Sequence, residues 1–356
     1  MQEKSEGWKR MRILMIGPDR SVHGGISGVV NNYYKAGLDR KVELCYIGTM
    51  VEGSKFRKLA QAAGAYVKFL LKLPGYEIVH VNIASDASYL RKSVFIETAK
   101  AFHKKIVIHQ HGGDFEGFYN HQLGARGRKR VKRVLSMGDA FLVLAPPFQD
   151  FFGRITGRND ITVFPDAIQI PPLAPKTYGQ HKLLFLGRIC KAKGIEELLQ
   201  VMPLLKEKYS DIKLYLGGIF EEQELQKRVE QLSDLVEWIG WVSGEEKEIY
   251  LKKCDIFVLP SYFEGQSVSI LEAMAHSCTV VASRTGGIPQ MIREGETGIL
   301  VEPKSAESLK QGLESALADR ELCEELGKAA RRKVEKEFSM EKNVEQLMKI
   351  YEGLLR

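Results

Sequence analysis

The sequence of 356 residues lacks any apolar run of the ~18 to 20 residues that a membrane-spanning helix requires. Its first residues, MQEKSEGWKRMR, carry too many charges for a secretory signal peptide, so we expect a cytoplasmic protein. The five cysteines are scattered, odd in number and without metal-ligand spacing, which predicts reduced thiols in the core. No zinc-binding spacing and no aromatic RNA-binding motif is present, which argues against a nucleic-acid-binding protein.

Acidic metal-binding pairs are also missing, because no two aspartates stand at positions i and i+2. The chain is too long for one ordinary core, so two domains are expected. An apolar share of 44% and a charged share of 27% are typical of a soluble globular protein. The composition therefore favours a two-domain protein with a metal-independent site.

Positive charge is concentrated in the first half of the chain. Residues 1–170 contain 26 Lys and Arg against 15 Asp and Glu, whereas residues 171–356 contain 26 against 30. The basic residues cluster in Lys55–Lys72 and in RGRKRVKR, Arg126–Arg133. Each run alone could face only water, but two runs in one half favour a surface role, for which an anionic membrane is the expected partner.

Strand and helix signals alternate along the chain. Short apolar runs that end at Gly, Pro or polar residues read as buried strands, and the stretches between most of them have helical periodicity. Residues 165–182 contain four prolines and no helical period, which predicts a linker between two such regions. The pattern predicts an α/β fold of two doubly wound, Rossmann-like domains, residues 1–168 and 169–342. Predicted strands are Met11–Pro18, Val42–Gly48, Tyr76–Asn82, Lys104–His111, Asp139–Phe148, Ile161–Asp166, Lys182–Ile189 and Cys254–Ser261.

The stretch Pro260–Gly287 holds a pair of carboxylates at a strand-to-helix turn. A buried strand ends at Pro260, and the following helix leaves the backbone N–H groups of residues 266–268 free to bind an anion. Glu264 precedes this helix and Glu272 lies more than one turn inside it. A nucleotide sugar, with an anionic diphosphate between two hydroxylated ends, suits this arrangement. Taken alone, however, the two glutamates are as easily solvated helix charges.

Five further residues stand at or just after the carboxyl ends of predicted strands. Gly24 and Gly25 at the first strand-to-helix junction allow close approach of a phosphate or sugar, although many glycine pairs only form turns. His111 ends its strand where ligands bind in open α/β sheets, and the alternative is a polar strand-end residue. Arg188 and Lys193 follow the first strand of the second domain, where they would neutralise a diphosphate or remain surface charges.

Three motifs resemble the family 4 retaining glycosyltransferases, which have the GT-B fold. They are GRICKAKG (Gly187–Gly194), DIFVLPSYFEGQSVSILEAMA with its Glu-x7-Glu pair, and VVASRTGGIPQMI followed by GETGILVEP. Together they cover most of residues 182–303. The first domain resembles the family more loosely, through HGGISG, the VHVN strand and His111.

This resemblance implies a role for each candidate residue. It also implies transfer with retention, by same-face attack without an enzymic nucleophile, and a terminal helix, residues 343–356, that returns to the first domain. In the family's pattern, Arg188 and Lys193 would hold the donor diphosphate, and Glu272 would bind the ribose. Glu264, with the amides of Gly265, Gln266 and Ser267, would bind the transferred sugar. Gly25 would lie near the phosphates, and His111 would lie near the reacting sugar.

The chain departs from the family pattern at three places. Gln266 and Ser267 stand where Phe-Gly is common, Gln290 where Pro-Glu is common, and Asp166 with Ala167 where Asn-Gly is common. None of these removes the diphosphate site. They leave the identity of the sugar open.

The expected protein is therefore a metal-independent, retaining hexosyltransferase of bacterial cell-surface polysaccharide synthesis. It would use a nucleoside-diphosphate sugar, UDP before GDP, and no cofactor. Its acceptor would be a lipid-linked or growing glycan, reached from the inner face of the membrane. Two alternatives remain open, a GT-B sugar-nucleotide epimerase and a non-catalytic nucleotide-sugar-binding protein.

Overall fold

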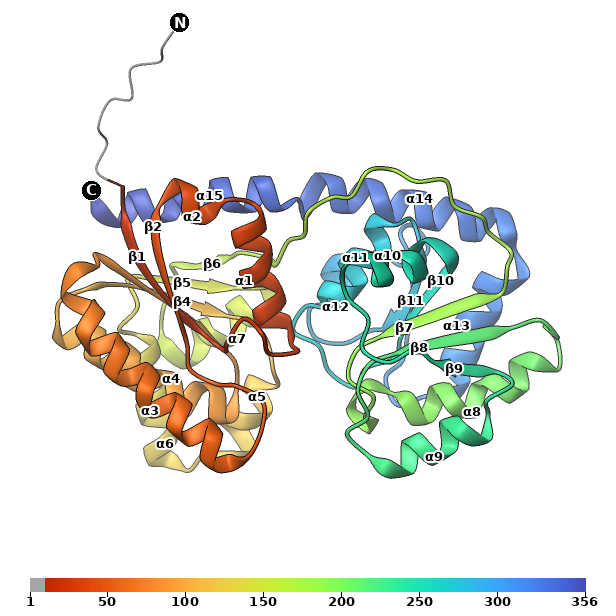
Figure 1. Cartoon of the computed structure of the whole chain (residues 1–356), viewed down its shortest axis with the longest axis horizontal. Helices are drawn as coiled ribbons and strands as arrows, with labels where there is room; N and C mark the ends of the chain where they lie inside the picture. Colours follow the sequence, from red (N-terminus) through yellow and green to blue (C-terminus); the bar gives the residue numbers. More distant parts are fainter. Residues whose placement is uncertain (1–9) are drawn as a thin grey trace, which may run out of the picture. The chain divides into compact units, whose positions relative to one another are not determined.

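The computed structural model describes residues 10–356, which divide into two compact units. Among the described residues, unit 1 comprises residues 10–169 and Met340–Arg356, and unit 2 comprises Ile170–Ser339 (Figure 1). The α/β class and the two doubly wound sheets are as predicted. The terminal helix begins at Met340, three residues before the position expected from the sequence.

Unit 1 contains a six-stranded sheet with strand order β2-β1-β3-β4-β5-β6. Every pairing is parallel. Because both faces of the sheet are covered, the central strands β1 and β3 are buried over nearly their whole length. The strands are β1 (Arg12–Gly17), β2 (Glu43–Gly48), β3 (Ile78–Ile83), β4 (Lys105–Gln110), β5 (Ala140–Val143) and β6 (Ile161–Val163).

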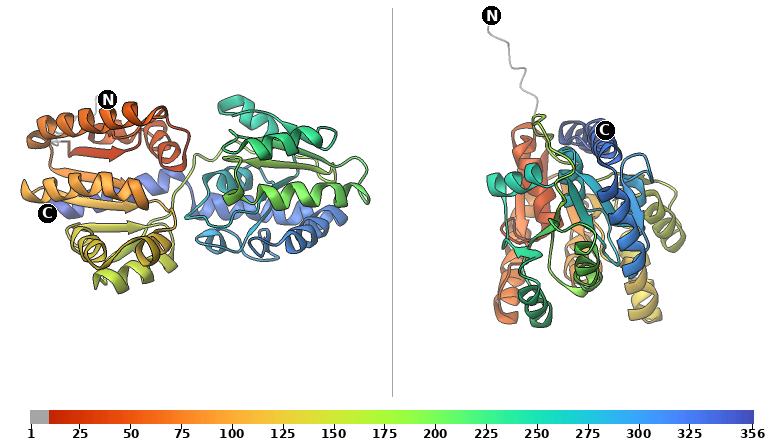
Figure 2. Two further views of the ribbon diagram at one scale, coloured as in Figure 1. Left: turned by 90° about the horizontal axis from the view of Figure 1, so that it is seen from below. Right: turned by 90° about the vertical axis from the view of Figure 1, so that its right-hand side faces the viewer.

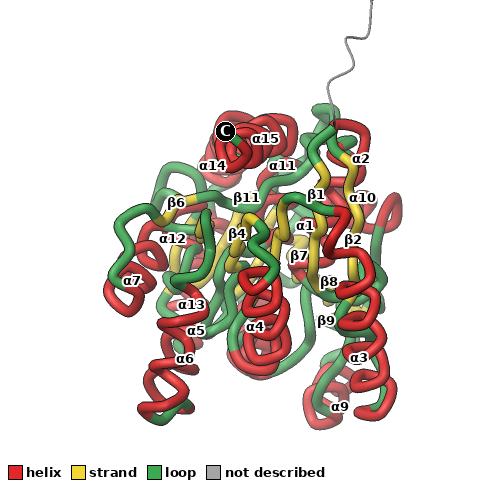
Figure 3. The backbone as a smooth tube through the Cα atoms, turned by 90° about the vertical axis from the view of Figure 1, so that its left-hand side faces the viewer, coloured by secondary structure: helices red, strands yellow, loops and turns green. Residues whose placement is uncertain are grey.

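The helices of unit 1 form a layer on each face of this sheet (Figures 2 and 3). One layer contains α1 and α15, which contact each other, and the other contains α3, α4 and α6 in that spatial order. The helices are α1 (Gly25–Lys35), α2 (Leu38–Lys41), α3 (Lys55–Lys72), α4 (Asp86–Ala101), α5 (Phe115–Gly117), α6 (Ala125–Leu135), α7 (Pro146–Thr156) and α15 (Met340–Leu355).

Unit 2 repeats this plan with strand order β12-β11-β10-β7-β8-β9, again with parallel pairing throughout. Its central strand β10 is buried along its whole length. The strands are β7 (Lys182–Leu186), β8 (Lys213–Gly217), β9 (Val236–Trp238), β10 (Ile256–Leu259), β11 (Thr279–Ser283) and β12 (Ile299–Val301). The helices are α8 (Ile195–Lys206), α9 (Gln223–Gln231), α10 (Gly244–Lys253), α11 (Val268–Ala275), α12 (Ile288–Met291), α13 (Ala306–Ala318) and α14 (Arg320–Glu337).

Several predicted strands are too long. Ile161–Asp166 ends at Val163 and Lys182–Ile189 ends at Leu186, and the largest excess is in a third strand. The expected strand Asp139–Phe148 ends at Val143, and α7 begins at Pro146. The reason is that proline has no N–H for a sheet and its fixed φ suits the first turn of a helix. The two adjacent prolines therefore start a helix instead of extending the sheet.

The predicted linker has no helix and is attached to unit 2 by its side chains. Lys176 Nζ donates to the carbonyl of Leu251 at 2.6 Å, and Tyr178 Oη donates to the carbonyl of Ser277 at 2.8 Å. All five cysteines are free thiols, as predicted. Within residues 10–356, no helix combines the length and hydropathy needed to cross a bilayer.

The chain returns to unit 1 through α15. Tyr351 is fully buried there, and its hydroxyl lies 2.6 Å from Nδ1 of His80 on β3. Asn343 Nδ2 donates to the carbonyl of Pro165 at 2.7 Å, and the amide of Met340 donates to the carbonyl of Ile168 at 2.9 Å. Since α15 supplies buried groups to unit 1, it is a structural part of that unit.

Candidate functional site

The turn between β10 and α11 has the geometry of an anion site. Ser267 is the N-cap of α11 and its hydroxyl accepts a hydrogen bond from the amide of Ile270. The amides of Ser267 and Val268 donate no hydrogen bond to any residue between 10 and 356. Unused N–H groups at the start of a helix, together with the helix dipole, attract negative charge.

Glu264, before this helix, forms an ion pair with Lys193. The Lys193 ammonium donates to Oε1 of Glu264, and the Ser261 hydroxyl donates to the same oxygen at 2.9 Å. Both charged side chains are mostly buried. The structure therefore brings together two residues that are 71 positions apart in the sequence and that we predicted to share one site.

Two glycines allow the backbone segments around Glu264 to meet. Gly194 has φ of +70°, and a Cβ there would lie 2.0 Å from the carbonyl oxygen of Pro260. Gly286 has φ of +54°, and a Cβ there would lie 1.7 Å from the carbonyl oxygen of Glu264. The amide of Gly287 also donates to that carbonyl at 3.0 Å. No other residue type fits these approaches, so the loops that hold Glu264 depend on both glycines.

Glu272 has a partner that the sequence did not indicate. Lys247, on α10, donates from Nζ to Oε1 of Glu272 at 2.6 Å, and each side chain is about three-quarters buried. Nothing in the spacing of these residues signals the pair, because it forms only when two helices pack in unit 2. Lys247 therefore joins the candidate site residues.

Arg188 lies after β7 and is paired with Glu221 at 2.8 Å. Burial opposes its charge, but the hydrogen bond and attraction from Glu221, with a smaller attraction from Glu264, raise the pKa of the guanidinium. More than half of the side chain is exposed. Arg188 therefore stays positively charged and accessible to a ligand, and Glu264 contributes to keeping it charged.

In unit 1, α1 begins at Gly25 after an extended Gly24. A Cβ at either glycine would meet no atom within 4 Å, so the fold of the described residues does not require glycine there. The loop is held by His23, whose amide and Nδ1 each lie 3.0 Å from Oε1 of Glu52. The space at the start of α1 is consistent with the predicted approach of a ligand to Gly25.

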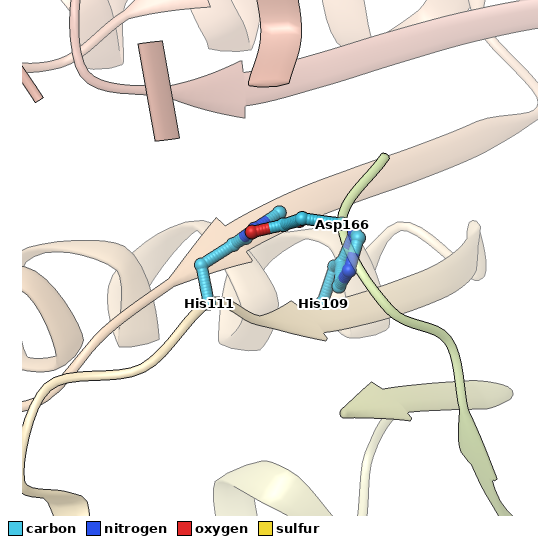
Figure 4. A group of neighbouring side chains, drawn as sticks. All are labelled: His109, His111 and Asp166. Carbon is cyan, nitrogen blue, oxygen red and sulfur yellow. The ribbon is translucent and has the colours of Figure 1, made fainter. Parts of the chain in front are cut away.

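His111 follows β4 and is held on both sides of its ring. Nδ1 lies 3.0 Å from Asp166 Oδ1, and Nε2 lies 2.7 Å from Asn82 Oδ1. Figure 4 shows the His111 ring and the Asp166 carboxylate pointing toward each other. Asn82 in turn donates to the carbonyl of Ile16 at 3.0 Å. The orientation of His111 is therefore set by β1, β3 and the segment after β6, and Asp166 and Asn82 are positioning residues that sequence reasoning did not assign.

His109, His111 and Asp166 also lie close enough to be considered as metal ligands, since one donor atom of each lies within 4.8 Å of the others. A metal must lie near the plane of each imidazole that binds it. The rings of His109 and His111 instead stack, with centroids 3.8 Å apart and planes 39° apart. Burial lowers the pKa of His109 well below its usual value, so its ring is neutral. This geometry suits stacked aromatic rings better than a metal centre, with hydrogen bonds made by His111.

Comparison with known proteins finds a family model that matches part of unit 2. Residues 173–333 match the family described as glycosyl transferases group 1. An uncharacterized glycosyltransferase of Methanocaldococcus jannaschii is 31% identical over 175 residues, which are 48% of this chain and 45% of that protein. The chain spans about half the length of the curated relatives it matches.

The solved structures that resemble the chain show its fold. A sucrose-phosphate synthase from Thermosynechococcus elongatus matches with a TM-score of 0.81 and 22% identity, over 97% of this chain and 99% of that one. The HepE protein of Anabaena, solved in complex with UDP and glucose, matches with a TM-score of 0.74 and 16% identity, over 96% and 100%. The fold is GT-B, as the resemblance of the motifs implied.

Proposed function

We propose that the protein is a retaining hexosyltransferase that moves a sugar from a nucleoside-diphosphate sugar to a lipid-linked or growing glycan. The donor base would be uracil before guanine, and the pathway would be bacterial cell-surface polysaccharide synthesis. The protein would work in the cytoplasm at the inner face of the membrane. The buried Lys193–Glu264 pair beside the unused amides of α11 is the observation that carries the proposal.

The donor would be held by unit 2 through complementary charges. The amides of Ser267 and Val268, with Lys193 and Arg188, offer positive charge to a diphosphate. Glu272 would accept hydrogen bonds from the ribose while Lys247 holds its carboxylate. Because HepE was solved with UDP, the similarity of fold supports the preference for uracil.

The reaction would need no residue that attacks the sugar. The bond between the anomeric carbon and the diphosphate oxygen breaks as the acceptor oxygen bonds to the same face of that carbon. The acceptor proton passes to the departing diphosphate oxygen. Lys193 and Arg188 would stabilise the charge that develops on this oxygen, which in comparable sites is worth about 3 kcal/mol. Neither step requires a metal ion.

Glu264 and His111 would contact the transferred sugar. The Glu264 carboxylate has one oxygen engaged by Lys193 and Ser261, which leaves the other for sugar hydroxyls. His111 would exchange its contact with Asn82 for the sugar while Asp166 keeps the ring in place. Gly25 would let the backbone at the start of α1 approach the phosphates.

A thermal-shift panel with UDP, GDP and ADP in the presence of EDTA tests the donor assignment. A ligand that binds the native state increases the free energy of unfolding, by about 2.7 kcal/mol at a ligand concentration of a hundred times its Kd, and so raises the unfolding midpoint. We expect UDP to give the largest shift and Glu272→Ala to reduce it. If none of the three nucleotides shifts the midpoint, the donor site proposed in unit 2 is wrong.

A further inference from the structure

Unit 1 contains a cavity of about 490 Å³ to which the proposed chemistry assigns no role. It lies between α1, β2 and α3, at the loop that follows β1. Its position at the carboxyl ends of two parallel strands is where open α/β sheets bind ligands. Its polar and aromatic lining comprises Asp19, Arg20, Tyr34, Tyr46, Gln61 and Lys68.

Arg20 is held in place by contacts with Asn31 and Tyr34. Its Nε donates to Asn31 Oδ1 at 2.8 Å, and its guanidinium carbon lies 3.7 Å from the centre of the Tyr34 ring. Asn31 Nδ2 donates back to the carbonyl of Arg20 at 3.0 Å. The guanidinium of Arg20 forms no ion pair within residues 10–356, and its side-chain contacts are with Asn31 and Tyr34. A guanidinium fixed in this way is prepared to bind a phosphate or carboxylate through its fork.

The remaining polar groups leave the cavity with a net positive charge. Hydrogen bonds from the amide and hydroxyl of Ser21 lower the pKa of Asp19, so this carboxylate stays ionised. It opposes two cations, Arg20 and Lys68, and Lys68 forms neither an ion pair nor a hydrogen bond in the described part of the chain. Gln61 donates to the carbonyl of Gly48 at 2.7 Å, which leaves its own carbonyl for a ligand hydroxyl. One excess positive charge among hydroxyl-binding groups suits a phosphorylated polyol.

Helix α3 forms one wall of this cavity and also presents an apolar surface to solvent. Ala65 and Phe69 face the core, while Phe56 is 82% exposed and Leu71 is 78% exposed. The exposed apolar residues follow i, i+3 and i, i+4 spacing and so form one stripe along the helix. This stripe comprises Phe56, Leu59, Ala63, Val67 and Leu71.

The cavity is beside this stripe. Gly64 and Lys68 line the cavity, and each directly follows a stripe residue, so each lies about 100° around the helix from it. Helix α3 contains five Lys and Arg and no acidic residue. Helix α3 therefore has apolar residues toward the core, a second apolar face toward solvent, and basic residues between them. This pattern is typical of a helix that lies in a membrane surface.

The neighbouring helices extend this surface. Helix α4 lies between α3 and α6 and exposes Leu90 and Val94 (Figure 2). Helix α6 contains six Lys and Arg among its eleven residues. Apolar groups on α3 and α4 beside cations on α6 are complementary to a bilayer with anionic headgroups. A protein partner would not require positive charge along two helices of this layer.

We infer that α3 lies in the surface of an anionic membrane and that the adjacent cavity binds the phosphate-bearing headgroup of a membrane lipid, the acceptor or its anchor. This inference rests on the proposed transfer to a lipid-linked acceptor and names the part of unit 1 that receives it. Arg20 and Lys68 bind the phosphate, and Asp19 and Gln61 bind hydroxyl groups beside it.

Vesicle co-sedimentation of the full chain tests the inference. The vesicles are phosphatidylcholine with about 30 mol% of either phosphatidic acid or phosphatidylserine, at low salt. We expect the wild-type protein to prefer phosphatidic acid, whose phosphate is free, and Arg20→Gln with Lys68→Gln to lose that preference. A charge-matched control, Lys35→Gln with Lys41→Gln, should keep it. If the cavity variant keeps the preference as the control does, the cavity assignment is wrong.

The stripe is tested separately. Phe56→Ser with Leu71→Ser should lower binding to both kinds of vesicle by about tenfold or more and leave the lipid preference unchanged, because these residues contribute apolar contact. Unchanged binding would overturn the membrane placement of α3. Inorganic phosphate provides a third arm. Arg20-dependent binding of phosphate without vesicle binding would show a site for a soluble anion and overturn the lipid assignment.

These outcomes are independent of donor binding. All three double variants should retain the wild-type thermal shift with UDP, since none alters unit 2. Failure of the vesicle experiments with an intact UDP shift would refute this inference alone, whereas loss of the UDP shift in the wild type would refute the donor proposal.

Discussion

Glu264 and Glu272 are both paired with lysine but differ in where the lysine comes from. Lys193 lies between the first strand of unit 2 and α8, next to the turn at which we propose that the diphosphate binds. Lys247 lies on α10 and supports Glu272 inside the packed unit. This difference suggests that the first pair acts on the reacting groups and the second maintains a nucleotide contact.

Glu272→Ala should therefore weaken UDP binding by about ten- to a hundredfold, because a hydrogen-bonded carboxylate contributes roughly 1.5 to 3 kcal/mol. Glu264→Ala should leave UDP affinity within about threefold of wild type and reduce transfer by about a hundredfold or more. Calorimetric titration with UDP and a transfer assay measure the two effects. Equal losses of UDP affinity in both variants would contradict the division of roles.

His80 makes the stability of unit 1 dependent on pH. Burial, with a smaller contribution from His111, lowers its pKa from 6.5 to about 3. Above pH 6.5 both the folded and the unfolded states hold a neutral imidazole, so this residue has no effect there. Between pH 6.5 and about 3 only the unfolded state binds the proton, so stability falls as the pH falls.

The free energy of unfolding should accordingly drop by about 2 kcal/mol between pH 7 and pH 5 from His80 alone. His80→Asn places an amide near Nδ1, where it can still contact Tyr351, and should show a smaller drop. Urea denaturation at the two pH values measures the difference, with the exposed His103→Asn as the control. A drop as large in His80→Asn as in the control would show that another group is responsible.

At the scale of elements, the β10–α11 turn depends on the short loop between β11 and α12. Gly286 in that loop lies against the carbonyl of Glu264, and Gly287 donates a hydrogen bond to it. The catalytic carboxylate proposed here is thus positioned by a loop that carries no reactive group. The glycine pair of VVASRTGGIPQMI is therefore explained by its backbone contact with Glu264.

Gly286→Ala should lower both stability and transfer. The added methyl group would displace the Glu264 backbone, and we expect a loss of about 2 to 4 kcal/mol together with most of the transfer activity. Gly295→Ala is a matched control, because Gly295 also has positive φ, +70°, but a Cβ there meets no atom within 4 Å. It should cost only about 1 kcal/mol of backbone strain. Similar stability and activity of the two variants would show that the contact with Glu264 is unimportant.

At the scale of the whole molecule, the chain leaves unit 1 near residue 169, builds unit 2 and returns at Met340. Helix α15 then contributes four fully buried apolar side chains to unit 1, namely Met340, Val344, Leu347 and Tyr351. Each such side chain is worth about 1.5 to 3 kcal/mol when buried. Helix α15 is therefore needed for the stability of unit 1.

Deletion of residues 340–356 should destabilise unit 1 and leave the core of unit 2 intact. Hydrogen exchange followed by mass spectrometry should show loss of protection in β1, β3 and β4, with β7, β10 and β11 unchanged. A point variant, Tyr351→Phe, leaves His80 without its partner and should weaken protection in the same strands by about 1 to 3 kcal/mol. Equal loss of protection in both units would argue against this division.

Much of the fold follows from local signals. The strands of both sheets are short apolar runs bounded by breakers, and their alternation with helical periodicity is enough to predict two parallel sheets. The family motifs in unit 2 identify Glu264, Glu272, Arg188 and Lys193 because the residues of each motif lie close together in the chain. The strand predicted over Asp139–Phe148 was too long because Pro146 and Pro147 begin a helix, which is a local signal that the prediction did not use.

The sequence by itself determined the class of fold and predicted the site residues of unit 2, because short-range spacing encodes both. Only the tertiary structure decided which charges meet. Lys247 with Glu272, Asp166 with His111 and α15 with β3 are pairs separated by 25, 55 and 271 positions. The cavity beside α3 likewise exists only where three elements and a loop converge. Such contacts depend on the packing of whole elements, which no local pattern specifies.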